Sequence, residues 1–369
     1  MDEDLPKGPL RRGWTTGSCA TAAAKIAYVG WRTGDFPAMV PITLPSGDRP
    51  TFAAACHGAA EDGAWAGVVK DAGDDPDVTH GALVTATVRA APPGVGVVFE
   101  AGEGVGTVTR PGLPLAVGEP AINPVPRKMI ATAISEAATE TGGPSDVVVA
   151  IGIRDGARIA EKTLNPRLGI LGGLSVLGTT GIVVPFSCAA WIHSIYRGID
   201  VARAERLTHI AGSTGATSEA AVQRLYDLPD IALIDMGDFA GGMLKYLRRH
   251  PVERITIAGG FAKIVKLGQG LLDLHSRSGR VDFDWLAERV GEAGGDAALV
   301  AAAREANTAN QVLEEARQAD VPVGDLIAGR AWETAARALR DEAMALEVAI
   351  FDRKGVLVAR SPMRPAKGG

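Results

Sequence analysis

The chain has 369 residues, of which 46% are hydrophobic and 22% are charged, and its formal net charge at pH 7 is −5. This composition is typical of a globular protein with two or three domains and sizeable hydrophobic cores. The acidic balance argues against a nucleic-acid-binding surface, which is usually basic, and no apolar run is long enough to span a membrane.

Cysteine and histidine patterns exclude two further classes of protein. Cys19, Cys56 and Cys188 lie far apart without a C-x-x-C pair, and the six histidines show neither H-x-x-x-H nor H-E-x-x-H spacing. We therefore expect neither a disulfide framework nor a protein-bound metal. The first residues, MDEDLPKGPLRRG, are polar and lack a secretory-signal pattern, so we expect a cytoplasmic protein.

The first half of the chain predicts a helix, a set of strands and two further helices. Thr15, Thr16 and Ser18 stand where N-caps are expected, before an alanine-rich helix that ends near Gly30 or Gly34. The segments VPITLP, TFAAACH, AGVVKD and ALVTATVRA predict strands of a mixed or antiparallel sheet. We also expect a hairpin from residues 95–100 and 105–110, a helix over 127–139, a buried strand over 146–153 and a helix over 189–204.

The second half of the chain has a different pattern. Three consecutive strand–loop–helix units begin near residues 208, 231 and 254, which predicts a parallel sheet with right-handed crossovers. Residues 283–347 are expected to be mostly helical with a break near 322–324, and EVAIFDRKGVLVAR predicts a short hairpin. The predicted fold is therefore an N-terminal mixed-sheet α+β domain over 1–205, followed by a parallel-sheet, Rossmann-like α/β domain with extra helices over 206–369.

The run KTLNPRLGILGGLSVLGTTGIVVPF, residues 162–186, is rich in glycine and hydroxyl side chains between apolar residues. Glycine allows close backbone approach, so the run suits an ordered loop that presents backbone N–H groups and hydroxyls to a ligand. A buried, tightly turning crossover between two layers is the alternative. The candidate substrate-binding side chains in this run are Lys162, Asn165, Arg167, Thr179 and Thr180. The cationic Lys162 and Arg167 suit carboxylate groups of a ligand.

The segment KDAGDDPDVT, residues 70–79, holds four aspartates beside one lysine. Its spacing does not fit an EF-hand. It is either a solvated turn or a carboxylate cluster that binds ligand N–H groups, with one member able to act as a base. On the second interpretation Asp71 and Asp75 are catalytic candidates, Lys70 and Asp74 bind substrate, and Pro76 turns Asp77 outward.

Two more sites follow from the predicted elements. The helix start at Thr15, Thr16 and Ser18 either binds an anion through free N–H groups or is simply capped. The carboxyl ends of the parallel strands form the usual ligand-binding edge of such a sheet and suit an adenine-nucleotide-type ligand, with Asp235 for the ribose hydroxyls. The cofactor-binding candidates at this edge are Gly212, Gly215, Asp235, Gly259, Gly260 and Lys263.

Several long motifs together resemble the cobalt-precorrin-5B C1-methyltransferase family of the anaerobic-type cobalamin pathway. They are RRGWTTGSCATAAAKIA, VVKDAGDDPDVT, GEGVGTVTRPGLPLAVGEPAINPVPRKMI, EKTLNPRLGILGGLSVLGTTGIVVPFS and the IAGGFAKIVKLGQG…LHSRSGRVD region, and they cover roughly residues 10–285. The family usually has Gly-His-x-Gly-Lys where this chain has Gly259-Gly260-Phe261-Ala262-Lys263. The histidine is absent here, so any role that it has in the family cannot be assigned to this chain.

The resemblance implies methyl transfer from S-adenosylmethionine, the cosubstrate, to C1 of a ring-contracted tetrapyrrole that brings any cobalt with it. The partners it implies are the tetrapyrrole and other enzymes of the pathway that hand the macrocycle on, with neither nucleic acid nor membrane, and a homo-oligomer is left open. A nucleotide-binding oxidoreductase and a non-catalytic tetrapyrrole carrier remain as alternatives. The first predicts affinity for a nicotinamide cofactor, and the second predicts macrocycle binding without turnover.

Overall fold

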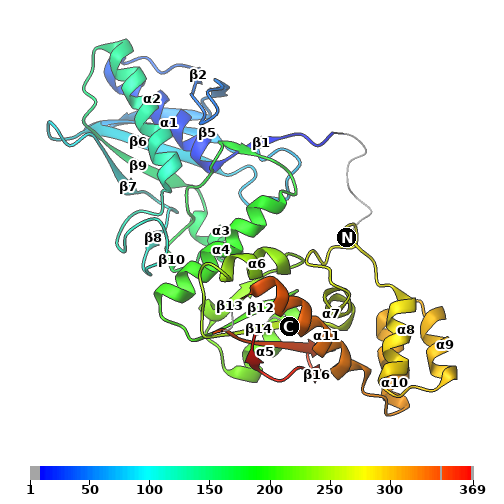
Figure 1. Cartoon of the computed structure of the whole chain (residues 1–369). Coiled ribbons are helices and arrows are strands. Elements are labelled where there is room, and N and C mark those ends of the chain that lie inside the picture. The colour runs from blue at the N-terminus through cyan, green and yellow to red at the C-terminus, as the bar shows by residue number, and fades with distance from the viewer. Residues whose placement is uncertain (1–8, 341–342, 367–369) are drawn as a thin grey trace. The chain divides into compact units, whose positions relative to one another are not determined.

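The computed structural model describes residues 9–340 and 343–366, which divide into two compact units at Ser187 and Cys188 (Figure 1). The sequence had placed the domain boundary at residue 205. The difference is the helix α4 (Cys188–Ala204), whose buried side chains Ile195 and Ile199 belong to the core of the second unit.

The first unit is built on a five-stranded sheet in the order β4-β5-β6-β9-β7. All neighbours are antiparallel except β7 and β9, which run parallel, so the sheet is mixed as expected. The strand β6 alternates buried and half-buried residues, β5 does so only in its first half, and the apolar β9 is buried almost throughout. The bounds are β4 (Cys56–Ala60), β5 (Gly63–Val69), β6 (Leu83–Ala90), β7 (Val97–Ala101) and β9 (Val147–Ile153).

Two helices, α1 (Thr16–Thr33) and α2 (Pro124–Thr141), pack on each other, and α1 lies against β5 and β6 (Figure 1). Alanines at positions 20, 22, 23, 24 and 27 are fully buried, and their small side chains let α1 approach the sheet closely. Thr15 caps the start of the helix and Gly34, in the left-handed region, caps its end. The predicted N-cap region is confirmed, and of the two predicted ends, Gly30 and Gly34, the structure shows Gly34.

Short strand pairs complete the first unit. The pair β1 (Gly13–Trp14) and β11 (Ile182–Val183) joins its beginning to its end, while β2 (Met39–Pro41) pairs with β3 (Thr51–Ala53). The predicted 95–110 hairpin is wrong, because β8 (Thr107–Val108) pairs with β10 (Ile170–Leu171) and β7 joins β9. A short helix, α3 (Gly156–Ala160), follows β9.

The second unit holds a six-stranded sheet in the order β13-β12-β14-β15-β16, with β17 also paired to β15. The strands β13, β12, β14 and β15 are parallel, and the predicted C-terminal hairpin forms from β15 and β16. Residues 345–347, expected to be helical, begin β15 instead. The bounds are β12 (His209–Ser213), β13 (Leu233–Asp235), β14 (Arg254–Gly260), β15 (Ala345–Phe351), β16 (Leu357–Arg360) and β17 (Arg364–Pro365).

Helices cover both faces of this parallel sheet. The helix α5 packs through Ala221 and Val222 on one face, and α4, α6, α7 and α11 form a larger core on the other (Figure 1). The bounds are α5 (Ala216–Tyr226), η1 (Asp230–Ala232), α6 (Ala240–Leu247), α7 (Phe261–Gly268), α8 (Phe283–Glu292), α9 (Ala297–Glu305), α10 (Ala309–Gln318) and α11 (Val323–Leu339). Among the described helices, none is both long and apolar enough to cross a bilayer.

Candidate functional site

The start of α1 is closed by the glycine-rich run of the same unit. Ser18 Oγ donates to Gly181 O at 2.7 Å, and Thr16 Oγ1 donates to Leu177 O at 3.2 Å. Thr15 Oγ1 accepts the Ser18 N–H, and the Gly17 N–H donates to Leu177 O. These contacts occupy the groups expected to bind an anion, so the structure supports simple capping here.

The glycine-rich run turns tightly where it meets the start of α1. A Cβ at Gly178, whose φ is +140°, would lie 2.3 Å from Thr15 Oγ1, so the turn requires glycine. Asn165 is buried, donates to Thr163 Oγ1 and accepts from Ser175 Oγ at 3.0 Å, so it braces the run from within. The remaining candidates differ in exposure, since Thr179 and Thr180 are exposed and Arg167 is half-buried.

The acidic loop is tied to the segment before β1. The Arg11 guanidinium forms an ion pair with Asp71, and the Arg11 N–H donates to Asp74 Oδ2 at 2.6 Å. The hydrogen bond from Arg11 and a second from the Gly73 N–H lower the pKa of Asp71 to about 2. A carboxylate with so low a pKa is a weak base, which argues against Asp71 as a proton acceptor.

Lys70 and Asp77 form a buried ion pair at the other end of this loop. Lys70 Nζ donates to Asp77 Oδ2 at 2.6 Å, and its side chain is only 1% exposed. Asp77 Oδ1 also accepts from Thr79 N and Oγ1. The expectation that Asp77 turns outward is therefore wrong, and Lys70 has its charge neutralised inside the unit. Asp75 instead accepts the Phe186 N–H at 2.8 Å.

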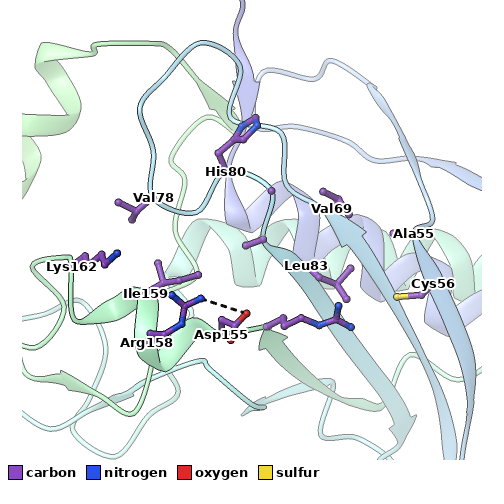
Figure 2. Close-up of a pocket in the computed structure, with 13 residues that line it drawn as sticks. Ala55, Cys56, Val69, Val78, His80, Leu83, Asp155, Arg158, Ile159 and Lys162 are labelled. Carbon is purple, nitrogen blue, oxygen red and sulfur yellow. Dashed lines mark ion pairs between the residues drawn. The ribbon is translucent and has the colours of Figure 1, made fainter.

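A pocket of about 690 Å³ lies in the first unit, between strands β4–β6, the end of the acidic loop and α3 (Figure 2). Among the site residues predicted from the sequence, only Lys162 lines this pocket. In Figure 2, Arg158, Ile159 and Lys162 lie on one side of the pocket. On the other side are Val69, Leu83 and Cys56 on their strands, and Ala55 just before β4. Arg154, Asp155, Val78, His80, Gly81 and Ala82 complete the lining.

Sequence reasoning missed Arg154, Arg158 and His80. A signal was present, because Arg154, Arg158 and Lys162 follow one another at intervals of four residues directly after a predicted buried strand. The Nδ1 atom of His80 accepts the Ala72 N–H at 3.1 Å, so a neutral His80 carries its proton on Nε2.

In the second unit, the strand order places the topological switch point between β12 and β14. The helices that follow these strands, α5 and α7, have Gly215 and Gly260 at their N-cap positions. Because glycine has no side chain, no side-chain oxygen of the N-cap residue accepts from the first N–H groups of either helix. A Cβ at either position would meet no atom within 4 Å, so both helix starts face open space. Ser213 Oγ, at the end of β12, is buried without a hydrogen-bond partner among the described residues.

Two family models match this chain, one over most of the first unit and one over the later part of the second. A family model described as CbiD matches residues 3–185, and one described as CbiD, C-terminal domain, matches residues 273–362. A Bradyrhizobium protein named cobalt-precorrin-5B C(1)-methyltransferase is 68% identical to this chain, covering 95% of this chain and 94% of its own. The chain belongs to the CbiD family.

A second curated relative agrees with this assignment. An Agrobacterium fabrum protein of the same name is 59% identical, covering 97% of this chain and 94% of its own. A crystal structure titled as cobalamin biosynthesis protein (cbiD) from Archaeoglobus fulgidus is 28% identical, covers 73% of this chain and 83% of that chain, and has a TM-score of 0.41.

The other strand-end candidates of this CbiD chain have varied surroundings. A Cβ at Gly212 would lie 2.3 Å from Met243 Sδ, and one at Gly259 would lie 2.9 Å from Ile264 Cδ1, so both glycines serve close packing. Asp235 ends β13, and its carbonyl accepts the Trp191 indole N–H. Lys263 pairs with Asp238 and donates to Leu274 O, which accepts Lys266 Nζ as well. Across the described residues, no three His, Cys, Asp or Glu side chains gather as a metal-binding group.

Proposed function

We propose that this protein transfers a methyl group from S-adenosylmethionine to C1 of cobalt-precorrin-5B during cobalamin biosynthesis. The observation that carries the proposal is the 68% identity, over 95% of the chain, to a relative that bears this activity in its name. The proposal makes other enzymes of the same pathway the partners that supply and receive the macrocycle.

The switch point of the second unit supports a donor site there. The uncapped starts of α5 and α7 leave backbone N–H groups that suit the donor's methionine carboxylate, because helix N-termini favour anions. The unpartnered Ser213 Oγ is a buried polar atom that a ligand can satisfy. Asp235 ends the neighbouring strand β13, in register with Ser213, and the proposal gives its carboxylate the ribose hydroxyls.

The donor supplies a methyl group on a sulfonium. The residues of this chain bind the donor and the macrocycle and align the two for transfer. Bond formation at C1 needs an in-line approach more than an activated side chain, and alignment alone can contribute about 7–11 kcal/mol. Gly215 and Gly260 let a ligand approach the helix starts closely, since neither carries a side chain. The proton lost by the acceptor is released without Asp71, whose pKa of about 2 makes it a weak base.

Calorimetric titration tests the donor site. We expect the intact chain to bind S-adenosylmethionine and its demethylated product but not NAD. Gly215→Val and Gly260→Val should weaken donor binding tenfold or more with an unchanged melting temperature, because both backbones are compatible with valine and only the open space is filled. Gly329→Val is the matched control, since Gly329 on α11 also has open space around its Cβ position.

Mass spectrometry of the product tests the reaction. Purified protein, donor and cobalt-precorrin-5B should yield a macrocycle heavier by one CH₂ unit. Micromolar NAD binding without a response to S-adenosylmethionine would support the oxidoreductase instead, and macrocycle binding without any gain in mass would support the carrier.

A further inference from the structure

The pocket of the first unit gathers cationic side chains from one short stretch of chain. Arg154 follows β9, Arg158 lies on α3, and Lys162 follows α3, and all three line the pocket. The only carboxylate in the lining is Asp155, which lies 3.7 Å from Arg158. Leaving His80 aside, three cationic side chains and one carboxylate give the pocket an excess of positive charge.

Two of these cations have no protein partner. The side chains of Arg154 and Lys162 make no hydrogen bond or ion pair with any residue that the structure describes, whereas Arg158 has Asp155. Like charges close together repel unless an anion or water compensates them. The arrangement therefore suits an anionic ligand with at least two separated negative groups.

The opposite side of the pocket is apolar. Val69 is 53% exposed although it is a β-branched hydrophobic residue, and Leu83 and Ala55 continue this wall. Val78, 48% exposed, adds an apolar surface on the acidic loop, on the side of Lys162 in Figure 2. Figure 2 shows Val69 and Leu83 on their strands, with Ala55 just before β4, across the pocket from Arg158 and Ile159. A ligand that covers this wall must combine an apolar body with charged groups at its edge.

We propose that this pocket binds the carboxylate-bearing rim of the tetrapyrrole, with Arg154 and Lys162 holding peripheral carboxylates and Val69 and Val78 contacting the ring. The identity of the ligand as a tetrapyrrole rests on the proposed function, since the acetate and propionate groups of that macrocycle supply the negative charges. Arg154 binds a carboxylate in a bidentate manner and Lys162 acts as a point charge. The pocket volume, about 690 Å³, is in the usual range for a cofactor-sized ligand.

The pocket also reassigns the substrate-binding role expected from the sequence. The polar groups of Thr16, Ser18 and Lys70 form hydrogen bonds within the first unit. The Lys162 side chain lines the pocket, where a ligand can bind it. Capture of the macrocycle by Arg154 and Lys162 positions the ring without using any of the four aspartates of the acidic loop.

Stable porphyrins test the proposal without turnover. Uroporphyrin carries eight carboxylates and mesoporphyrin carries two, and binding of either to the full chain is followed by the shift of its visible absorption. We expect uroporphyrin to bind more tightly, with an affinity that falls as salt is added. Arg154→Gln and Lys162→Gln should each weaken uroporphyrin binding about tenfold, which is the expected loss of one charge-assisted hydrogen bond.

A matched control and a kinetic measurement complete the experiment. Lys128→Gln changes an exposed lysine of α2 that does not line the pocket, and it should leave uroporphyrin affinity unchanged. In methylation assays the pocket variants should raise KM for the macrocycle and leave donor affinity unchanged. Equal binding of the two porphyrins, no binding by the intact chain, or the same loss in Lys128→Gln as in Arg154→Gln would overturn the proposal. Failure of the chain to bind S-adenosylmethionine would contradict the proposed function and leave the porphyrin result standing.

Discussion

The Lys70–Asp77 ion pair gives the sharpest prediction about stability. The Lys70 side chain is 1% exposed and that of Asp77 is 25% exposed, so replacing Asp77 leaves an ammonium group buried without its counter-ion. Breaking a buried pair by removing one partner typically costs about 3–5 kcal/mol. Because Asp77 is partly exposed and asparagine keeps its shape, we expect the lower end, about 3 kcal/mol, for Asp77→Asn.

Differential scanning calorimetry of the full chain measures this effect. For a unit of this size, 1 kcal/mol shifts the melting temperature by about 2–4 °C, so Asp77→Asn should lower the transition of the first unit by about 6–12 °C. Hydrogen exchange in β5 and β6 assigns the transition to that unit. Asp74→Asn is the matched control, because Asp74 accepts a backbone N–H and should cost much less.

A double mutant decides whether the buried charge is the cause. Adding Lys70→Met to Asp77→Asn should recover most of the lost stability, since it removes the uncompensated ammonium. The pKa of Asp77 is lowered although burial alone would raise it, because the Lys70 charge and the bonds from Lys70 and Thr79 outweigh that effect. Its stabilising contribution is therefore present above the unfolded pKa of about 3.9 and is lost as the pH falls. Additive losses in the double mutant would refute this reasoning.

Two further predictions concern a buried histidine and a required glycine. Burial, and next the charge of Arg254, lower the pKa of His209 to about 4, so its contribution to stability is present above the ordinary value of 6.5 and is lost as the pH falls toward 4. His209→Gln should therefore reduce the fall in melting temperature between pH 6.5 and 4, whereas the exposed control His57→Gln should not. The same dependence of melting temperature on pH in both variants would contradict this reasoning. Gly178→Ala should destabilise the first unit by about 1–3 kcal/mol in urea unfolding, because its Cβ meets Thr15. Gly172→Ala also places alanine at positive φ but meets no atom within 4 Å, so equal losses in both variants would rule out the contact as the cause.

Local signals explain which elements could be predicted from the sequence. The Thr15 cap, the Gly34 stop and the apolar strand β9 depend on neighbouring residues, and the structure confirms them. The 95–110 hairpin was wrong because β7 pairs with β9, whose residues lie far along the chain, and nothing within the segment marks that partner.

The candidate site residues also divide into those that local sequence signals could predict and those that they could not. Gly215 and Gly260 were predicted at the strand ends because strand–loop–helix units fix where such loops lie. The partners of the aspartates could not be predicted, since Arg11 and Lys70 reach them through tertiary packing. Arg154 and Arg158 were missed because a four-residue spacing of cations usually marks a solvated helix face, and here α3 is too short to form one.

The position of β15 in the parallel sheet has a consequence for synthesis on the ribosome. The strand β14 is complete at Gly260, yet the neighbour that covers its second edge, Ala345–Phe351, is translated only after helices α7 to α11. Until then the nascent chain exposes the unpaired backbone of β14 and the apolar side chains that α11 later covers. The second unit can therefore complete its sheet only after β15 has been translated, and until then the free edge of β14 is open to pairing with other chains.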